Sequence, residues 1–380
     1  MRGKWIGLAT IILVFVAVGV VFVAILSTRK SAESLKVGAV LPLTGSAAVW
    51  GQNAKMGMDL AVDQINSGGG VNGKRLVVIY EDSQSDPKLA TSALQKLISA
   101  DGIQVVIGDI ASSSVLAMAP IAERNHIVLL SPGASNPEIS HAGRYIFRNW
   151  QSDALEGEVD ARFAYDKLKW RRVALLHVNN AYGTGLADVF KRVFTNLGGS
   201  VLREEFFEQS ATDMRTQITK IAATKPDGIY MPGYPPEMAT ALKQMRELAV
   251  TLPILSVQAF DDPEILKRAG DAAEGVIFSV PTPPDPKQPV VSAFHSQYAQ
   301  MYHKEPGVCS DTGYDAVRIV AWAIGQGAST GAQIREKMAA LNDFPGAAGK
   351  TTFDANGDVV RDFSFFKVKD GKFQPTEASK

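Results

Sequence analysis

Residues 104–135 read QVVIGDIASSSVLAMAPIAERNHIVLLSPGAS, and this stretch carries the pattern that decides the fold. A short, mostly apolar run at 104–107 leads through small and polar residues into a helical pattern at 112–124. A second apolar run follows at 127–130. Short apolar runs bounded by turn residues are typical of strands buried on both faces, and parallel strands need a crossover, usually a helix, to connect them. The stretch therefore predicts one strand–helix–strand unit of a parallel sheet.

The same alternation extends in both directions along the chain. Before this stretch, strands are predicted at 36–41 and 75–80, and helices at 53–66 and 87–100. A second series starts after Arg148, with strands predicted at 172–177, 201–206, 228–231 and 254–257 and helices at 152–168, 185–197, 213–223 and 236–249. Two such series predict an α/β fold with two doubly wound parallel-sheet lobes.

The remaining elements follow a proline-rich stretch, VPTPPDPKQP at 280–289, which breaks the alternation and marks a boundary. Helices are predicted at 290–303 and 310–325. The turn signal DANGD at 354–358 predicts a hairpin near the end of the chain.

The N-terminal segment differs in composition from the rest. The run from Trp5 to Leu26, WIGLATIILVFVAVGVVFVAIL, spans about 33 Å as a helix, which is enough to cross a bilayer. It is longer than the apolar core of a cleaved signal peptide, and Arg2 and Lys4 precede it. We expect residues 1–30 to form an uncleaved signal anchor, a transmembrane helix that holds the body on the extracytoplasmic face of the membrane. The alternative is a cleaved signal and a secreted body.

Composition and motifs exclude several classes of function. Lys+Arg 39 balances Asp+Glu 39, so the basic excess of a nucleic-acid binder is missing. The single cysteine, Cys309, allows neither an intramolecular disulfide nor a cysteine-based zinc site. Gly68–Lys74 has most of a phosphate-loop pattern, but Arg75 stands where Ser or Thr is needed and a strand follows instead of a helix. We therefore expect no enzyme, no cofactor and no metal.

The loops that follow the strands are the remaining candidates for a site, because ligands of open α/β sheets bind beyond the carboxyl ends of the strands. Ser112, Ser113 and Ser114 open a helix whose free N–H groups and dipole suit a carboxylate, and Gly133, Ala134 and Ser135 form a similar loop after the next strand. Ordinary helix capping is the alternative. Four aromatic residues stand near other strand ends and are either ligand walls or packing residues: Trp50, Trp150, Tyr182 and Tyr234.

Five stretches together resemble a known family. They lie at 41–87, 105–114 (VVIGDIASSS), 129–138 (LLSPGASNPE), 179–187 (NNAYGTGLA) and 227–239 (DGIYMPGYPPEMA). The chain is similar to the periplasmic leucine/isoleucine/valine-binding proteins that supply ABC importers, and the resemblance covers about residues 36–370.

The resemblance implies two lobes joined by three crossover strands, near Arg148–Gln151, Val280–Pro283 and Thr352–Arg361. Lobe 1 is expected at 36–148 plus 282–352, and lobe 2 at 149–281 plus 353–375. It also implies that the lobes close around the ligand by hinge bending, and that ABC permease subunits are the partner.

The same resemblance implies roles for the candidate residues. Ser114 and its neighbouring serines, with Gly133 and Ser135, would hold the ligand's α-carboxylate. Tyr182 and Tyr234 would close over the ligand from lobe 2, and Trp50 would contact its side chain.

One position departs from the family. Gln258 stands where leucine-binding proteins place a glutamate that pairs with the α-ammonium. A neutral amide loses a charge-assisted bond of about 1–3 kcal/mol. Asp153, Asp261 or Asp262 could supply the charge instead.

The sequence thus predicts the substrate-binding protein of an ABC importer, with an apolar, branched-chain amino acid as ligand. If none of the three aspartates supplies the charge, the ligand is an aromatic carboxylate or an amide. A receptor that senses its ligand without transporting it is a further alternative.

Overall fold

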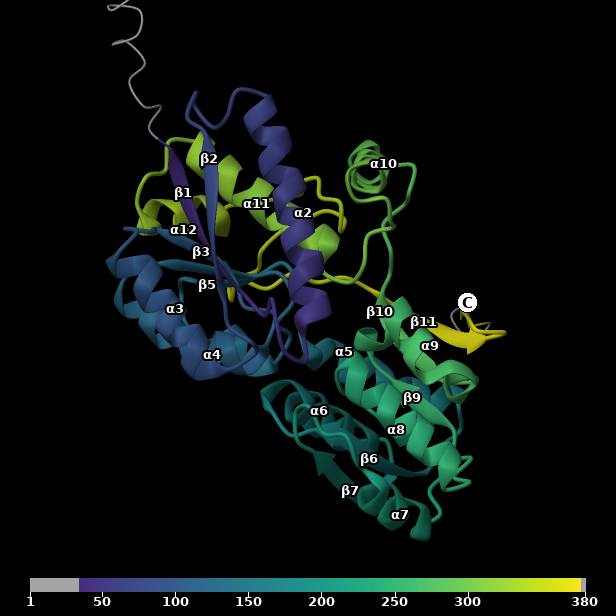
Figure 1. Ribbon diagram of the computed structural model, residues 1–380. Helices are drawn as coiled ribbons and strands as arrows, with labels where there is room; N and C mark the ends of the chain where they lie inside the picture. The colour runs from purple at the N-terminus through teal and green to yellow at the C-terminus, as the bar shows by residue number, and fades with distance from the viewer. Residues whose placement is uncertain (1–33, 377–380) are drawn as a thin grey trace, which may run out of the picture.

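A computed structural model describes residues 34–376 as two lobes, each built on one sheet (Figure 1). The first sheet is parallel, in the order β2-β1-β3-β4-β5. Its strands are β1 (Leu35–Leu41), β2 (Leu76–Asp82), β3 (Val105–Gly108), β4 (Val128–Ser131) and β5 (Ile146–Arg148). The strand order reverses at β1 and β3, so the loops beyond these strands diverge and leave room for a ligand.

Helices cover both faces of the first sheet. The helices from the first half of the chain are α2 (Ala48–Ser67), α3 (Pro87–Ser99) and α4 (Ser112–Arg124). Later in the chain come α10 (Pro289–Tyr302), α11 (Ser310–Gly325) and α12 (Gly331–Ala339). Successive residues of β3 face opposite ways: Val105 and Ile107 pack in the core formed with α2 and α11, and Val106 packs in the core formed with α3 and α4.

The closest helix contact in lobe 1 joins α2 to α11. A Cβ atom added to Gly57 would lie 1.8 Å from the carbonyl oxygen of Ser310, so only glycine fits there. This contact ties a helix from the first part of the chain to one that follows the second lobe.

The second sheet has the order β12-β11-β10-β9-β8-β6-β7. Its strands are β6 (Arg172–Val178), β7 (Ser200–Phe207), β8 (Gly228–Tyr230), β9 (Ile254–Ser256), β10 (Ile277–Pro281), β11 (Phe363–Lys369) and β12 (Lys372–Pro375). β6 to β10 run parallel, and β11 is antiparallel to both β10 and β12. The lobe's helices are α5 (Asp153–Arg162), continued by a π-helical turn at Phe163–Lys167, α6 (Ala181–Asn196), α7 (Arg215–Ala223), α8 (Pro235–Glu247) and α9 (Pro263–Ala269).

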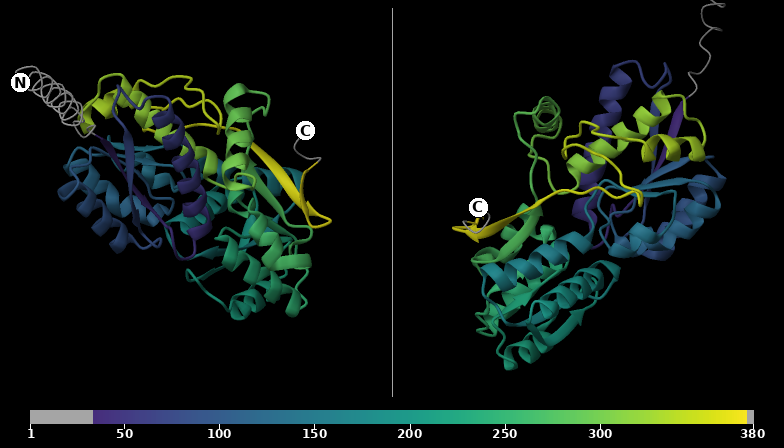
Figure 2. Two further views of the ribbon diagram at one scale, coloured as in Figure 1. Left: turned by 45° about the horizontal axis from the view of Figure 1, so that its top comes forward. Right: turned by 180° about the vertical axis from the view of Figure 1, so that it is seen from behind.

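Three segments connect the lobes, and they lie side by side (Figure 2). The first and third are joined by a parallel bridge between Gln151 and Val359. The second and third are joined by the N–H of Thr282, which donates to the carbonyl of Asp362 at 2.7 Å. The predicted lobe boundaries stay a proposal, for which this arrangement of the connections is the supporting observation.

Several local predictions differ from the structure. The turn at 354–358 forms, with the N–H of Asp354 donating to the carbonyl of Asp358, but its flanking segments do not pair as a hairpin. The hairpin lies later, between β11 and β12, where Asp370 and Gly371 have the positive φ angles that a tight turn requires. The helix predicted at 53–66 begins at Ala48, and the one at 152–168 changes to π-helical geometry after Arg162.

The predicted signal anchor at residues 1–30 lies outside the described residues and stays a prediction. Within residues 34–376, no helix combines the length and the apolar character needed to cross a membrane.

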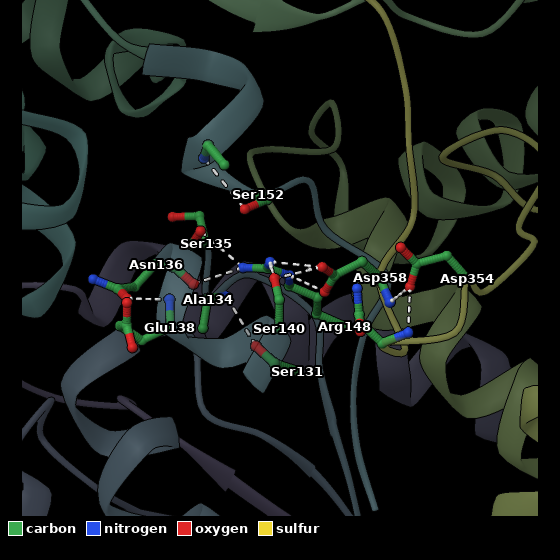
Figure 3. A network of polar contacts seen from close by, with 12 residues as sticks. Ser131, Ala134, Ser135, Asn136, Glu138, Ser140, Arg148, Ser152, Asp354 and Asp358 are labelled. Atoms are coloured by element: carbon green, nitrogen blue, oxygen red, sulfur yellow. Dashed lines mark hydrogen bonds and ion pairs between the residues drawn. The ribbon is translucent and has the colours of Figure 1, made fainter. Parts of the chain in front are cut away.

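Arg148, at the end of β5, is the most buried large side chain of the connecting region, with none of its surface exposed (Figure 3). Its Nε and Nη2 donate to the carboxylate of Asp358, at 2.6 and 3.1 Å. Its Nη1 donates to the carbonyls of Ser135 and Asn136, at 2.8 and 2.9 Å, and Nη2 also donates to the hydroxyl of Ser140. One guanidinium therefore joins the first connection, the third connection and the loop after β4.

Replacing Arg148 by methionine should lower the free energy of unfolding by about 3–5 kcal/mol, because it leaves the Asp358 carboxylate half-paired and two buried carbonyls without donors. Urea unfolding followed by circular dichroism measures the change. Arg162→Gln is the matched control, because it breaks only an exposed pair with Glu158 and should change stability by at most about 0.5 kcal/mol. Equal losses in the two variants would contradict the assignment.

Candidate functional site

A cavity lies between the two lobes, with an empty volume of about 320 Å³, part of which is open to solvent. Loops at the carboxyl ends of strands of both sheets contribute to its wall, together with the first connection and the segment before α11. The lining residues are Trp50, Ile110, Gly133, Ser135, Trp150, Tyr182, Tyr234, Gln258, Ala259, Val308 and Cys309. The cavity therefore occupies the place where open α/β sheets bind ligands.

Aromatic rings from both lobes form one side of the cavity. Trp50, in the first turn of α2, meets Tyr234 edge to face, with ring centroids 5.2 Å apart and planes at 71°. Tyr234 directly precedes α8 and stacks on Tyr182 of α6, with centroids 5.6 Å apart and planes at 17°. Such pairs contribute about 0.5–1.5 kcal/mol each beyond the burial of their area. They give a flat apolar ligand, or an apolar side chain, a preformed surface.

Buried polar atoms around the cavity have no hydrogen-bond partner within the described residues. Among them are the indole Nε1 of Trp50, the hydroxyl of Tyr182 and the side-chain Oε1 of Gln258. A buried donor or acceptor without a partner costs about 1–3 kcal/mol. A ligand that carries polar groups as well as an apolar body would remove this cost.

The three serines at the start of α4 lie around the cavity and do not line it. The hydroxyl of Ser112 accepts from the backbone N–H groups of Ser135 and Asn136, and that of Ser113 accepts from the N–H of Ala181 across the lobes, at 3.2 Å. Ser114 lies beside the buried carboxyl of Asp109. Ser112 and Ser113 thus hold the next loop and the other lobe, and the buried hydroxyl of Ser114 has no hydrogen-bond partner within the described residues. The predicted contact of the three serines with the ligand stays a prediction.

The loop after β4 does reach the cavity, through Gly133 and Ser135. Ala134 between them is fully buried, and its N–H donates to the hydroxyl of Ser131 at 2.8 Å. Figure 3 shows how this loop lies against the guanidinium of Arg148. Hydrogen bonds from Arg148 and to Ser131 thus hold the backbone of this loop in place without a ligand.

Asp153 is an acid that contacts this loop. It begins α5, its side chain is fully buried, and its N–H donates to the carbonyl of Ser135 at 2.7 Å. Neither carboxylate oxygen has a hydrogen-bond partner of normal geometry within the described residues. Burial raises the pKa of Asp153 to about 7, against the opposing effects of the Ser135 hydroxyl and the Arg148 charge.

Two further acids follow Asp153 along the inner face of α5. Glu156 accepts the N–H of Gln258 at 2.7 Å and the hydroxyl of Ser279 at 2.9 Å, and Asp160 accepts the hydroxyl of Tyr230 at 2.9 Å. Burial raises the pKa of both carboxyls well above the ordinary value, and repulsion from the neighbouring acids adds to it. Glu156 therefore holds the backbone of Gln258 in place at the cavity wall.

The residues considered as partners of a ligand ammonium lie in different places in the structure. Gln258 lines the cavity as a neutral amide. Asp261 lines a neighbouring cavity instead, and Asp262 accepts the N–H of Glu264 at the start of α9. Asp153 and Asp261 each contact a wall residue through the backbone: the N–H of Asp153 donates to the carbonyl of Ser135 at 2.7 Å, and the N–H of Asp261 donates to the carbonyl of Gln258 at 3.0 Å. Of the two side chains, that of Asp153 is fully buried, whereas Asp261 is exposed.

Four lining residues were missed by the sequence analysis. Ile110 and Ala259 are direct neighbours of loops that had been singled out. Val308 and Cys309 come from the segment between α10 and α11, where no local pattern points to a site. This segment reaches the cavity because α11 packs along α2, which is a tertiary contact between distant parts of the chain.

The lobes touch at the rim of the cavity. The hydroxyls of Ser46 and Ser210 lie 2.7 Å apart, and the side-chain amide of Asn136 donates to the carbonyl of Ala181. With the Trp50–Tyr234 contact, these bonds define a closed arrangement of the two lobes.

Two α/β lobes on three adjacent connections, with a cavity between them, define a class of proteins that bind a small molecule between their lobes. Residues 34–372 match the family model described as periplasmic binding protein, and the chain belongs to this family. The family places the globular body outside the cytoplasm.

Relatives and solved structures agree with this assignment. The chain is 29% identical over 344 residues to the leucine-, isoleucine-, valine-, threonine- and alanine-binding protein of Pseudomonas aeruginosa, covering 89% of this chain and 90% of that protein. A leucine-binding protein of Thermotoga maritima has a TM-score of 0.84 at 31% identity, over 90% of this chain and 97% of that one. A branched-chain amino acid transporter substrate-binding protein of Streptococcus pneumoniae, in complex with isoleucine, has a TM-score of 0.83 at 27% identity, over 90% and 98%.

The raised pKa of Asp153 predicts a pH-dependent effect of Asp153→Asn on stability. The folded value of about 7 lies above the ordinary value of 3.8, so the penalty for burying the charge is absent below about pH 4 and complete above pH 7. The variant should be more stable than the original protein by on the order of 3 kcal/mol at pH 8, with little difference at pH 4. Urea unfolding of both proteins at the two pH values checks this. A difference that does not change with pH would contradict it.

Proposed function

We propose that this protein binds a small carboxylate, most simply a branched-chain amino acid, in the aromatic cavity and delivers it to the permease subunits of an ABC importer. The observation that carries the proposal is the cavity itself, in which stacked aromatic rings stand beside buried polar atoms without partners. The names of the relatives from Pseudomonas aeruginosa and Streptococcus pneumoniae support the ligand class and the link to a transporter.

The two ends of the ligand would meet different groups. The carboxylate would lie at the loop of Gly133 and Ser135, whose backbone is held by Arg148 and Ser112. The apolar side chain would pack on the rings of Trp50, Tyr182 and Tyr234. The ammonium would lie between the carboxyl of Asp153 and the Oε1 of Gln258, because both are buried acceptors without a partner.

Closure gains free energy only from contacts that exist in the closed state. Tyr182 and Tyr234 come from lobe 2 and Trp50 comes from lobe 1, so a ligand between them touches both lobes only when the lobes are together. The ligand is therefore the group that shifts the protein toward the closed arrangement, which the permease would recognise.

Trp50→Ala and Tyr182→Ala should each weaken binding of leucine at least tenfold, because each removes an apolar surface at the centre of the site. Isothermal titration calorimetry measures the affinity. Ser99→Ala, at the exposed end of α3, is the control and should leave the affinity unchanged. If both cavity variants bind as tightly as the control, the ligand binds elsewhere.

An aromatic carboxylate or an amide is the second candidate ligand, and the neutral Gln258 favours it. Such a ligand has no ammonium, so it places no cation beside Asp153, which is half-protonated near neutral pH. The fold admits aromatic acids: a solute-binding protein of Rhodopseudomonas palustris in complex with benzoate has a TM-score of 0.82 at 24% identity, over 90% of this chain and 95% of that one.

Proton exchange separates the two ligand classes. An ammonium beside Asp153 lowers the pKa of that carboxyl, so binding of leucine at pH 7 should release protons. Benzoate instead brings a negative charge and no ammonium. Its charge raises the pKa of Asp153, so binding of benzoate should take protons up. Calorimetry at pH 7 in two buffers of different ionisation enthalpy measures the number of protons exchanged. Proton release that persists in Asp153→Asn would show that the ammonium lies elsewhere.

A further inference from the structure

A second, larger cavity adjoins the aromatic one and has an empty volume of about 1310 Å³, part of which is open to solvent. The two cavities share four lining residues, Trp150, Gln258, Val308 and Cys309. Prolines of the second connection form an apolar part of the larger wall. The two spaces therefore adjoin at these four residues.

Arg361, in the third connection, is the one lysine or arginine that lines this second cavity within the described residues. Its Nε and Nη2 atoms are buried and have no hydrogen-bond partner there. These two nitrogens form one edge of the guanidinium, and that edge matches the two oxygens of a carboxylate. A buried cation with an unpaired edge is unfavourable, and burial lowers the pKa of Arg361 accordingly.

The nearest acids do not occupy this edge. Asp315 is already bound by the N–H groups of Ala347 and Ala348, at 2.7 and 2.9 Å, and it pairs with Arg318. Asp311 accepts the N–H of Thr312 and attracts Arg361 electrostatically without forming an ion pair with it. Neither acid therefore pairs with this edge of the guanidinium.

The titratable groups that line this space besides Arg361 are Asp261, Asp311, His295 and Cys309. Asp261 is exposed at the surface, but desolvation by the surrounding residues, with repulsion from Asp262 and Asp311, raises its pKa to about 6. Desolvation also raises the pKa of Asp311. A second anion in the cavity would raise the pKa of both carboxyls further. They can then take up protons, which limits the repulsion between them and the anion.

We propose that the second cavity extends the ligand site and that Arg361 binds a carboxylate at the far end of an elongated ligand. The substrate class is then dicarboxylic: one carboxylate at the loop of Gly133 and Ser135, an apolar body beside Trp150, and a second carboxylate on the guanidinium edge. This inference rests on the proposed function, since the near end of the ligand occupies the aromatic cavity.

The test compares acids that differ only in the second carboxylate, with the full-length protein in detergent. Hexanoate is paired with adipate, octanoate with suberate, and norleucine with 2-aminoadipate and 2-aminopimelate. In calorimetry at pH 6.5, at least one dicarboxylate should bind tenfold or more tightly than its partner and should take up protons on binding.

Variants of Arg361 test whether the guanidinium causes the tighter binding of the dicarboxylate. Arg361→Gln should abolish the preference for the dicarboxylate and leave the affinity for the monocarboxylate within about twofold. Arg361→Lys keeps the charge without the paired edge and should retain part of the preference. Arg192→Gln, on the exposed surface of α6, is the matched control and should keep all of it. Circular dichroism shows whether each variant is folded. If Arg361→Gln does not fold, the comparison is made with Arg361→Lys alone.

Each other outcome overturns the inference. Equal affinities for the paired acids would show that the cavity takes no second carboxylate. Equal losses for both members of a pair in Arg361→Gln would assign a structural role to Arg361. A preference for lysine over norleucine, with none for the dicarboxylates, would assign the cavity to a cation held by Asp261 and Asp311. Binding of leucine or benzoate, without a dicarboxylate preference, leaves the proposed function standing; binding of no acid at all overturns both.

Discussion

The buried guanidinium of Arg148 is the interaction on which the geometry of the site depends. An isolated buried cation would destabilise the fold by several kcal/mol, and its attraction to a carboxylate repays this only when its other donors are also satisfied. Here Asp358, two loop carbonyls and the Ser140 hydroxyl satisfy them. The same bonds determine where the third connection passes and how the loop of Ser135 is held. The connections between the lobes and the loop at the cavity are thus parts of one hydrogen-bonded unit.

The cavity wall combines that fixed floor with groups that the fold leaves unfavourably placed. Asp153 is buried without a full set of partners, and Tyr182 and Gln258 each have a polar atom without one. These groups lower the stability of the protein without ligand, and in the proposed site they would raise the affinity for a ligand that supplies the missing partners. A site of this kind discriminates by polar complementarity, because a ligand that fails to satisfy a buried group leaves its penalty in place. The contrast between Gln258 and the glutamate expected there therefore bears directly on which molecules are accepted.

Much of the fold follows from local pattern, and less of the site does. The alternation of apolar strands and helices indicated both sheets, and the position of Trp50, Tyr182 and Tyr234 near strand ends indicated the aromatic wall. The serines of α4 do not by themselves indicate a ligand site, because a hydroxyl at the start of a helix can bind either a ligand or a neighbouring loop. Ser112 binds the neighbouring loop. The turn signal at 354–358 predicts the local conformation of the chain and not the partners of the flanking segments. What its flanks pair with is decided by Arg148 and Gln151, which lie about two hundred residues earlier in the chain.

The reactivity of the Cys309 thiol depends on its position in the cavity wall. It is the single thiol of the chain, and it stands in the wall that both cavities share. Burial raises its pKa well above the ordinary value, and the nearby Asp311 charge adds to this, so little of the reactive thiolate exists while the lobes are closed. We expect the sulfur to become more accessible when the lobes move apart. The rate at which a thiol reagent labels Cys309 would then report on opening of the lobes, with no dye and no engineered residue.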